Sequence, residues 1–359
     1  MDSNSSTIPV LNTGRKAMEQ LYERKLAKRW LILALLTIGC LLSFCLDIST
    51  GPSMLKFGEV LKGVFSPASV AKGTEIIIWK VRMPYAVMAV LVGMALSLAG
   101  AEMQTILNNP LASPFTLGVS AAASLGAGLA IILGVGIPFL SANWLVSANA
   151  FVFAFGSVLL LQALARWRGA GVDVLVLFGI ALVFTFNALV ALLHFIATPE
   201  ALQQLVFWNM GSLSRSNWDK VQILAIVIAV IVPFSMLTSW KMTALRLGEE
   251  RAQSFGIHVK RLRFYSMLRI SFLSATAVSF VGTIGFIGLV GPHIARMLIG
   301  EDHRYWFPAS LLTGALVMSL ASVASKIIVP GTLIPVGVVT ALVGIPVFLY
   351  LIIRKDRKS

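Results

Sequence analysis

The sequence predicts an all-α, polytopic membrane protein whose helices cross the bilayer about ten times. Of its 359 residues, 57% are hydrophobic and 12% are charged, and the mean hydropathy is +0.87. Soluble domains carry about 25% charged residues, and a chain of this length can hold several spans of roughly 20 residues. A third observation is the apolar tract 282–304, which glycines and a proline interrupt. In lipid, such a backbone is tolerated only where it packs against protein or lines a cavity.

Ten apolar runs separated by polar segments define the predicted spans. They cover residues 30–46, 84–107, 115–137, 144–165, 173–197, 220–240, 264–286, 288–299, 306–326 and 336–353. An even number of spans puts both termini on the same side. With the N-terminus inside, 21 Lys and Arg residues fall in inner segments and 8 in outer segments. The positive-inside rule therefore predicts that both termini are cytosolic.

The N-terminal segment 1–29 is polar and basic. It imitates the start of a secretory signal, but it is long, and no small-residue cleavage site follows Asp47. We expect a cytosolic tail over 1–29, at most weakly helical, and a single transmembrane permease domain over 30–359. The net charge of +14 gathers in short loops between apolar runs, which indicates membrane topology and not nucleic-acid binding.

The sequence contains none of the common motifs of nucleotide, metal or hydrolase sites. The patterns GxxxxGK[ST], HExxH, paired CxxC and GxSxG are all absent. The four histidines are scattered, and Cys40 and Cys45 have a spacing that does not bring them together on a helix. We therefore expect no catalytic residue, no bound metal and no cofactor.

Three ionisable residues lie near the ends of predicted spans: Glu102, His194 and Lys326. An intramembrane charge is a functional hypothesis by default. Each of these residues can also reach an interface, where snorkelling or local pairing explains it. A secondary carrier driven by ions needs buried acids near the midplane, and none is evident. Such a carrier and an integral membrane enzyme are the alternatives from other classes.

The inner loop 241–263 predicts a short helix. Gly248 precedes Glu249 and Glu250, whose acids suit the first turn of a helix, and Gly256 is suited to end it. The loop is either a solvated basic hairpin that fixes topology or a rigid element that bears on a cytosolic partner. These residues alone leave both interpretations open.

Cations also occur in the outer segments, against the positive-inside trend. Arg82, Arg215 and Lys326 are the main examples, with Lys80 and Lys220 near two of them. They either steer an acidic partner to this side or contact lipid headgroups and water.

Five long motifs, taken together, resemble a known family. They are VRMPYAVMAVLVGMALSLAGAEMQTILNNPLASPFTLGVSAAASLG at 81–126, WNMGSL at 208–213, LRLGEERAQSFGI at 245–257, GFIGLVGPHIARMLIGEDHR at 285–304 and IPVGVVTALVGIPVFLYLI at 334–352. With these motifs the chain resembles the FecCD-like permease subunits of type II ABC importers, which carry iron–siderophore complexes, haem or cobalamin. The resemblance covers nearly everything after residue 47.

The resemblance implies a multi-subunit importer in a bacterial inner membrane. Its expected partners are a cytosolic P-loop ATPase dimer, a second permease subunit in a homo- or heterodimer, and a periplasmic or lipid-anchored substrate-binding protein. Transport then proceeds by ATP-driven alternating access. An iron–siderophore complex is the first expectation for the cargo, with haem and cobalamin as alternatives.

The resemblance also implies roles for residues that match family motifs. The ATPase-coupling group is Gly248, Glu249, Glu250 and Gly256; the broken-helix or gating group is Gly288, Gly291, Pro292 and His293; the binding-protein docking group is Arg82, Arg215 and Lys326.

Four positions depart from the family pattern. Tyr85 and Lys326 stand where the family has arginines, Ser322 where it has an aspartate, and Leu333 where it has a glutamate. Lysine keeps the charge of arginine but not its planar fork. This loss of docking charge leads to the hypothesis that the subunit works in a heterodimer whose partner carries more of it.

Overall fold

The computed structural model describes residues 8–51, 55–138, 140–167, 172–329 and 331–356, and all regular structure in them is helical. The α-helices are α1 (Ile8–Ser49), α2 (Phe57–Phe65), α3 (Lys72–Ile76), α4 (Met83–Ile106), α5 (Val119–Leu133), α6 (Ala142–Trp167), α7 (Val172–Ile196), α8 (Pro199–Asn209), α9 (Trp218–Leu237), α10 (Ser239–Leu245), α11 (Glu249–Ser254), α12 (Val259–Val281), α13 (Ile287–Ile299), α14 (His303–Ile327) and α15 (Val336–Asp356). Short 3₁₀ or π segments are η1 (Pro67–Ser69), η2 (Ile77–Arg82), η3 (Phe115–Leu117) and η4 (Leu213–Arg215).

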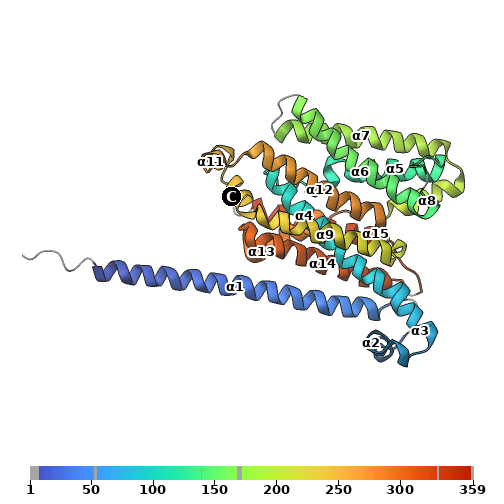
Figure 1. The fold of residues 1–359 in the computed structure, drawn as a ribbon, viewed down its shortest axis with the longest axis horizontal. Helices are drawn as coiled ribbons and strands as arrows, with labels where there is room; N and C mark the ends of the chain where they lie inside the picture. The colour runs from blue at the N-terminus through green and yellow to red at the C-terminus, as the bar shows by residue number, and fades with distance from the viewer. Residues whose placement is uncertain (1–7, 52–54, 139, 168–171, 330, 357–359) are drawn as a thin grey trace, which may run out of the picture.

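The long helices lie alongside one another in one bundle (Figure 1). Helix α11 lies at one end of this bundle, and α2, α3 and α8 lie at the opposite end. We refer to these as the α11 end and the α2 end.

Each predicted span coincides with a helix. Among the described residues, seven helices are long and apolar enough to cross a membrane: Glu19–Ser49, Lys72–Ile106, Trp144–Leu164, Val174–Ile196, Trp218–Leu237, Val259–Val281 and His303–Ile327. Three further apolar helices are shorter: Val119–Leu133, Ile287–Ile299 and Val336–Pro346. The all-helical polytopic fold is confirmed.

Helix α1 differs from its prediction. It runs without a break from Ile8 to Ser49, so the expectation that residues 1–29 are at most weakly helical is wrong for the described part. The apolar C-terminal half of α1 forms a helix by itself, and extending that helix into the polar segment needs no new nucleus. The helix packs along one side of the bundle, mainly on α14, and its N-terminal half projects past the α11 end (Figure 1).

Helix α4 forms the centre of the core. A stripe of small residues on α4 meets small residues of α13 and α14, so the backbones come into direct contact. The facing pairs are Gly93 with Gly314, Ser97 with Gly291, and Gly100 with Gly288. Small residues of this kind let membrane helices approach closely enough for van der Waals packing.

In the glycine-rich tract 282–304, the helix break lies before residue 287, and not at the expected residues 288–293. Helix α12 ends before Gly282, the chain is irregular to Phe286, and α13 begins at Ile287. Gly288, Gly291, Pro292 and His293 therefore lie inside α13, not at the break. Because Pro292 has no N–H, the carbonyl of Gly288 has no i+4 donor in the helix, and this carbonyl lies against Gly100.

Replacing Gly100 with alanine is expected to lower the free energy of unfolding by about 1–3 kcal/mol, because the new methyl group overlaps the Gly288 backbone. Chemical unfolding in mixed detergent micelles measures this change. Gly156→Ala on α6 is the matched control, since no atom lies within 4 Å of its added methyl group. Equal stability of the two variants contradicts the close contact.

Candidate functional site

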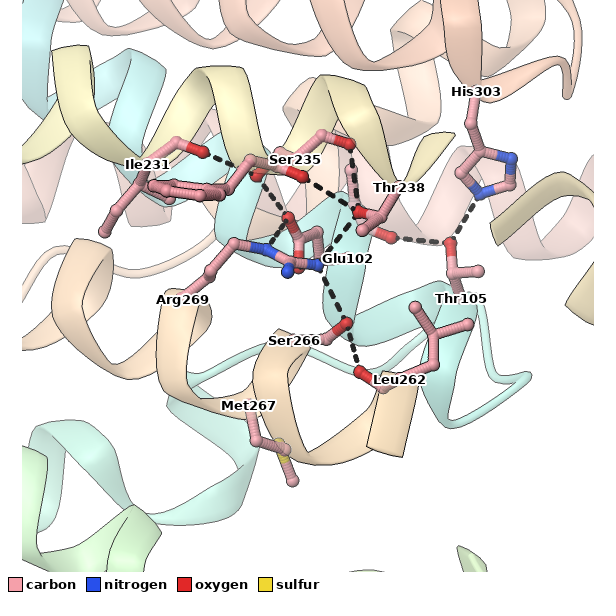
Figure 2. Close-up of polar contacts among 12 residues, drawn as sticks. Glu102, Thr105, Ile231, Ser235, Thr238, Leu262, Ser266, Met267, Arg269 and His303 are labelled. Atoms are coloured by element: carbon pink, nitrogen blue, oxygen red, sulfur yellow. Dashed lines mark hydrogen bonds and ion pairs between the residues drawn. The ribbon is translucent and has the colours of Figure 1, made fainter. Parts of the chain in front are cut away.

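A buried ion pair lies between α4 and α12 near the α11 end of the bundle. Arg269 donates from Nε to both carboxylate oxygens of Glu102, at 3.0 and 3.1 Å, and from Nη2 to Oε2 at 2.9 Å. Ser235 on α9 donates to the same carboxylate at 2.5 Å (Figure 2). Glu102 has no exposed surface. Three helices that are distant in sequence therefore meet at one carboxylate.

The other polar contacts of Arg269 extend this network to the inner loop. Its Nη2 donates to Ser266 Oγ at 2.9 Å and to Thr238 Oγ1 at 3.2 Å. Thr238 is the C-cap residue of α9 and the N-cap residue of α10. The ion pair is thus bonded to the residue at which the helix α10 starts.

His303 forms a second polar contact between the bundle and α10. Its Nε2 lies 2.8 Å from Thr105 Oγ1 on α4, and its Nδ1 lies 3.0 Å from Thr243 Oγ1 on α10. Both threonine hydroxyls also donate to carbonyls of their own helices, Thr105 to Ala101 and Thr243 to Ser239, so His303 links two helix surfaces. The ring is fully buried and packs edge-on against Trp306 and Phe307.

Residues 239–258, which we call the α10–α11 hairpin, also form ion pairs with residues outside this segment. Arg263 on α12 pairs with Glu249 and donates to the carbonyl of Ile106 at the end of α4, at 3.1 Å. On the other side, Arg246 pairs with Glu301 at 2.8 Å, between α13 and α14. The hairpin is therefore bonded directly to α12, to α14 and to the connection between α13 and α14.

The hairpin itself has the predicted local structure. Helix α11 begins after Gly248, with Glu249 and Glu250 in its first turn. Gly256 follows it with φ of +77°, a conformation that favours glycine, and the amide of Ile257 closes the turn on the carbonyl of Ala252. A recess of about 490 Å³ lies beside this turn. The predicted helix and both of its ends are confirmed.

Asp302 joins α1 to α14 near the hairpin. Its carboxylate caps α14 through the amide of Arg304, accepts from the Arg304 guanidinium at 2.8 and 3.0 Å, and accepts from Arg29 at 3.2 Å. Burial alone would raise the pKa of Asp302, but the hydrogen bonds and charge of Arg304, with the charge of Arg29, lower it below its ordinary value.

A second buried ion pair lies at the α2 end. Asp47 on α1 accepts from Lys326 Nζ and from Ser322 Oγ, both at 2.6 Å. Lys326 also lies 4.3 Å above the Tyr85 ring. Two of the positions that depart from the family pattern, Ser322 and Lys326, thus bond to one aspartate, and a third, Tyr85, packs against Lys326. Tyr85, Ser322 and Lys326 form an internal cluster between α1, α4 and α14.

The three predicted docking cations differ in their surroundings. Lys326 is bonded to Asp47, and Arg82 is buried and donates to the carbonyls of Ile48 and Ser49, both at 3.0 Å. Their charged groups face their own chain. Arg215 in η4 is only partly buried. The docking role of all three stays a prediction.

Sequence reasoning found part of these clusters. Local pairing, one of two explanations offered for Glu102 and Lys326, is what the structure contains. The partners Arg269 and Asp47, and the contacts of His303, were missed. Arg269 was counted with the inner loop cations although the predicted span 264–286 already included it, and it lies well inside α12, which begins at Val259. In the described residues, no three His, Cys, Asp or Glu side chains gather as they would around a metal ion.

Comparison with known proteins agrees with this architecture. The profile of the FecCD transport family matches residues 39–354. The hemin transport system permease HmuU of Yersinia pestis is 36% identical over 279 residues, covering 77% of this chain and 84% of that protein. The Fe(3+)-citrate import permease YfmE of Bacillus subtilis is 36% identical over 285 residues, covering 79% and 84%.

A vitamin B12 import permease and a solved structure extend the comparison. BtuC of Salmonella paratyphi A is 33% identical over 329 residues, covering 92% of this chain and 96% of that protein. An inward-facing structure described as a metal-chelate type ABC transporter superposes with a TM-score of 0.79 and 29% identity, covering 90% of this chain and 99% of that one.

Removing one partner of the buried pair leaves the other charge uncompensated. Glu102→Gln and Arg269→Met are each expected to lower the free energy of unfolding by about 3–5 kcal/mol, and the double variant by clearly less than the sum. Chemical unfolding in mixed micelles gives all three values, with the exposed Glu250→Gln as the control. Additive single effects rule out a direct interaction.

The lowered pKa of Asp302 predicts acid sensitivity. The ionised carboxylate stabilises the fold above its unfolded pKa of about 3.9, and this contribution is lost as the pH falls through the lower folded value. The melting temperature of the wild type should therefore fall more than that of Asp302→Asn between about pH 6 and pH 3. The exposed Asp219→Asn should follow the wild type, and parallel curves for all three proteins would contradict the assignment.

Proposed function

Because this chain belongs to the FecCD transport family and is the permease subunit of an ABC importer, we propose that its cargo is an iron–siderophore complex. The family imports iron chelates, haem or cobalamin. The resemblance to the Fe(3+)-citrate permease YfmE and to the metal-chelate type structure supports an iron chelate. The resemblance to HmuU and BtuC keeps haem and cobalamin as alternatives.

An ABC importer permease works with an ATPase and a substrate-binding protein. We propose that the ATPase is a P-loop dimer that contacts the α10–α11 hairpin, and that a second permease subunit completes the path. In this arrangement the α11 end and both termini are cytosolic, in a bacterial inner membrane, and a periplasmic or lipid-anchored binding protein approaches the α2 end. The charge bias of the loops supports this orientation.

The observation that carries the coupling proposal is the attachment of the hairpin to the buried network. Thr238 bonds to Arg269, and Thr243 bonds to His303, so both ends of α10 are joined to side chains of the bundle core. A push on α11 is then transmitted to α4, α9, α12 and α14 as one displacement. ATP-driven closure of the nucleotide subunits would in this way open the permease to one side at a time.

The gating proposal concerns Gly288, Gly291, Pro292 and His293 on α13. The backbone of α13 touches the backbone of α4 at Gly288, and at Gly291 it lies against the small side chain of Ser97. Pro292 frees one helix carbonyl at the same level. We propose that α13 shifts along α4 during transport, because few interlocked side chains oppose such a movement.

The α2-end cluster bears on the choice of partner subunit. Lys326 is committed to Asp47, and Tyr85 carries no charge, so this copy offers fewer cations for an acidic binding protein than the family pattern. This supports the heterodimer hypothesis. A purified functional complex with two copies of this chain and no other permease would exclude it.

Replacing Gly256 with valine tests the coupling role. A β-branched residue is strongly disfavoured at φ of +77°, so the turn after α11 should distort and the hairpin should no longer transmit movement. We expect uptake of iron-55 supplied as ferric siderophore to fall by about tenfold or more, while ATP hydrolysis by the assembled complex continues. Gly58→Ala, in an open position on α2, is the control and should transport normally.

Three results would count against this assignment. Normal uptake by Gly256→Val removes the hairpin from coupling. Uptake that continues after the ATPase is inactivated indicates a secondary carrier instead. Uptake of haem or cobalamin, with no uptake of ferric siderophores, keeps the permease and changes the cargo.

A further inference from the structure

A recess of about 620 Å³ opens at the α2 end, outside both buried ion-pair clusters. It lies between α8, the C-terminal end of α5, the N-terminal end of α6 and the start of α9. Sites for small molecules have volumes of about 300–1,000 Å³. The recess is thus large enough for a small organic ligand and is concave, unlike a typical protein docking face.

Two cations are held together on one wall of this recess. Arg215 ends η4, and Lys220 lies in the first turn of α9. Asn217 caps α9 by accepting from the amide of Lys220 at 2.9 Å, and Lys220 Nζ donates to the carbonyl of Arg215 at 3.1 Å. The backbone and the hydrogen bonds therefore keep both positive charges beside the same space.

These charges have no negative partner in the part of the chain that the structure describes. Neither side chain lies within ion-pair distance of a carboxylate there, and Nη1 of Arg215 is buried without a hydrogen-bond partner. Burial lowers the pKa of Arg215, because partial removal from water disfavours its charged form. Lys326, in contrast, is neutralised by Asp47.

The rest of the lining suits an organic body. Trp144 and the exposed Phe207 supply aromatic surface, and Gln203 and Gln204 supply amides that both donate and accept. Glu200 also lines the recess, without forming an ion pair with either cation. Two cations and one carboxylate leave the recess with a net positive charge, and aromatic surface beside such a charge complements an aromatic or carboxylate-bearing anion.

We propose that this recess binds an oxygen-ligated ferric chelate of net negative charge, and that Arg215 and Lys220 recognise that charge. The inference rests on the proposed function and narrows its cargo to anionic chelates. An acidic surface of the binding protein is the competing occupant. It is disfavoured because Arg215 lies within a concave site instead of on an exposed rim.

The test compares two cargoes that differ in charge. A ferric tris-catecholate is triply negative, whereas a ferric tris-hydroxamate with neutral arms is uncharged. Uptake of each, labelled with iron-55, is measured in cells that carry the wild type, Arg215→Gln/Lys220→Gln, or the control Lys72→Gln, which removes an exposed cation at the same end. We expect the double variant to lose about tenfold or more of catecholate uptake and to keep hydroxamate uptake.

Equal loss of both cargoes assigns the two cations to docking of the binding protein and overturns the proposal, and so does unchanged catecholate uptake. If the wild type imports neither chelate, the proposed cargo fails. Binding of the same two chelates to the purified importer in nanodiscs then decides the site separately. Selective binding of the catecholate that the double variant loses supports it, and no charge-dependent binding overturns it.

Discussion

The close backbone contact along α4 is the constraint on which the rest of the structure depends. Lipid supplies no hydrophobic force between helices, so α4 is held to α13 and α14 by contact of small residues such as Gly93 and Gly100. In the conformation described here, this contact sets the positions of the two ends of α4 relative to its neighbours. Glu102 near one end and Tyr85 near the other then lie within reach of partners on other helices, so one helix carries a polar residue into each buried cluster.

The two buried ion pairs have different consequences. A buried pair contributes little net stability, because desolvation offsets the attraction, but breaking it is costly. Each pair therefore acts mainly by specifying which helices meet. The pair of Asp47 and Lys326 joins α1 to α14. The pair of Glu102 and Arg269 is bonded through Thr238 to the start of α10, and this connects the hairpin to α4, α9 and α12. This difference makes the α11 end the better candidate for coupling.

The recess beside α8 differs from the two ion-pair clusters in how its positive charges are balanced. At both ion-pair clusters the chain supplies its own counter-charge, whereas Arg215 and Lys220 have none among the described residues. Arg82 and Lys326 therefore differ from Arg215 and Lys220 in a way that composition alone does not show. The first two are bonded to groups of their own fold, and we propose that the other two bind an anion that arrives from outside.

The sequence by itself determined the spans, the fold class and the local form of the hairpin. Each of these depends on neighbouring residues: apolar runs of bilayer length, acids after Gly248, and a glycine at 256. The helical N-terminal half of α1 was missed because a polar stretch was judged without the helix that it extends. The glycines of α13 were interpreted as a break, although two of them form a packing face toward α4.

Only the tertiary structure decided which charges are partners. Glu102 and Arg269 are 167 residues apart, and Asp47 and Lys326 are 279 apart, so no local pattern links them. Their pairing depends on how helices pack, which is set by surface shape along whole helices. For the same reason the sequence could list the cations of the α2 end but could not tell which of them are neutralised inside the fold.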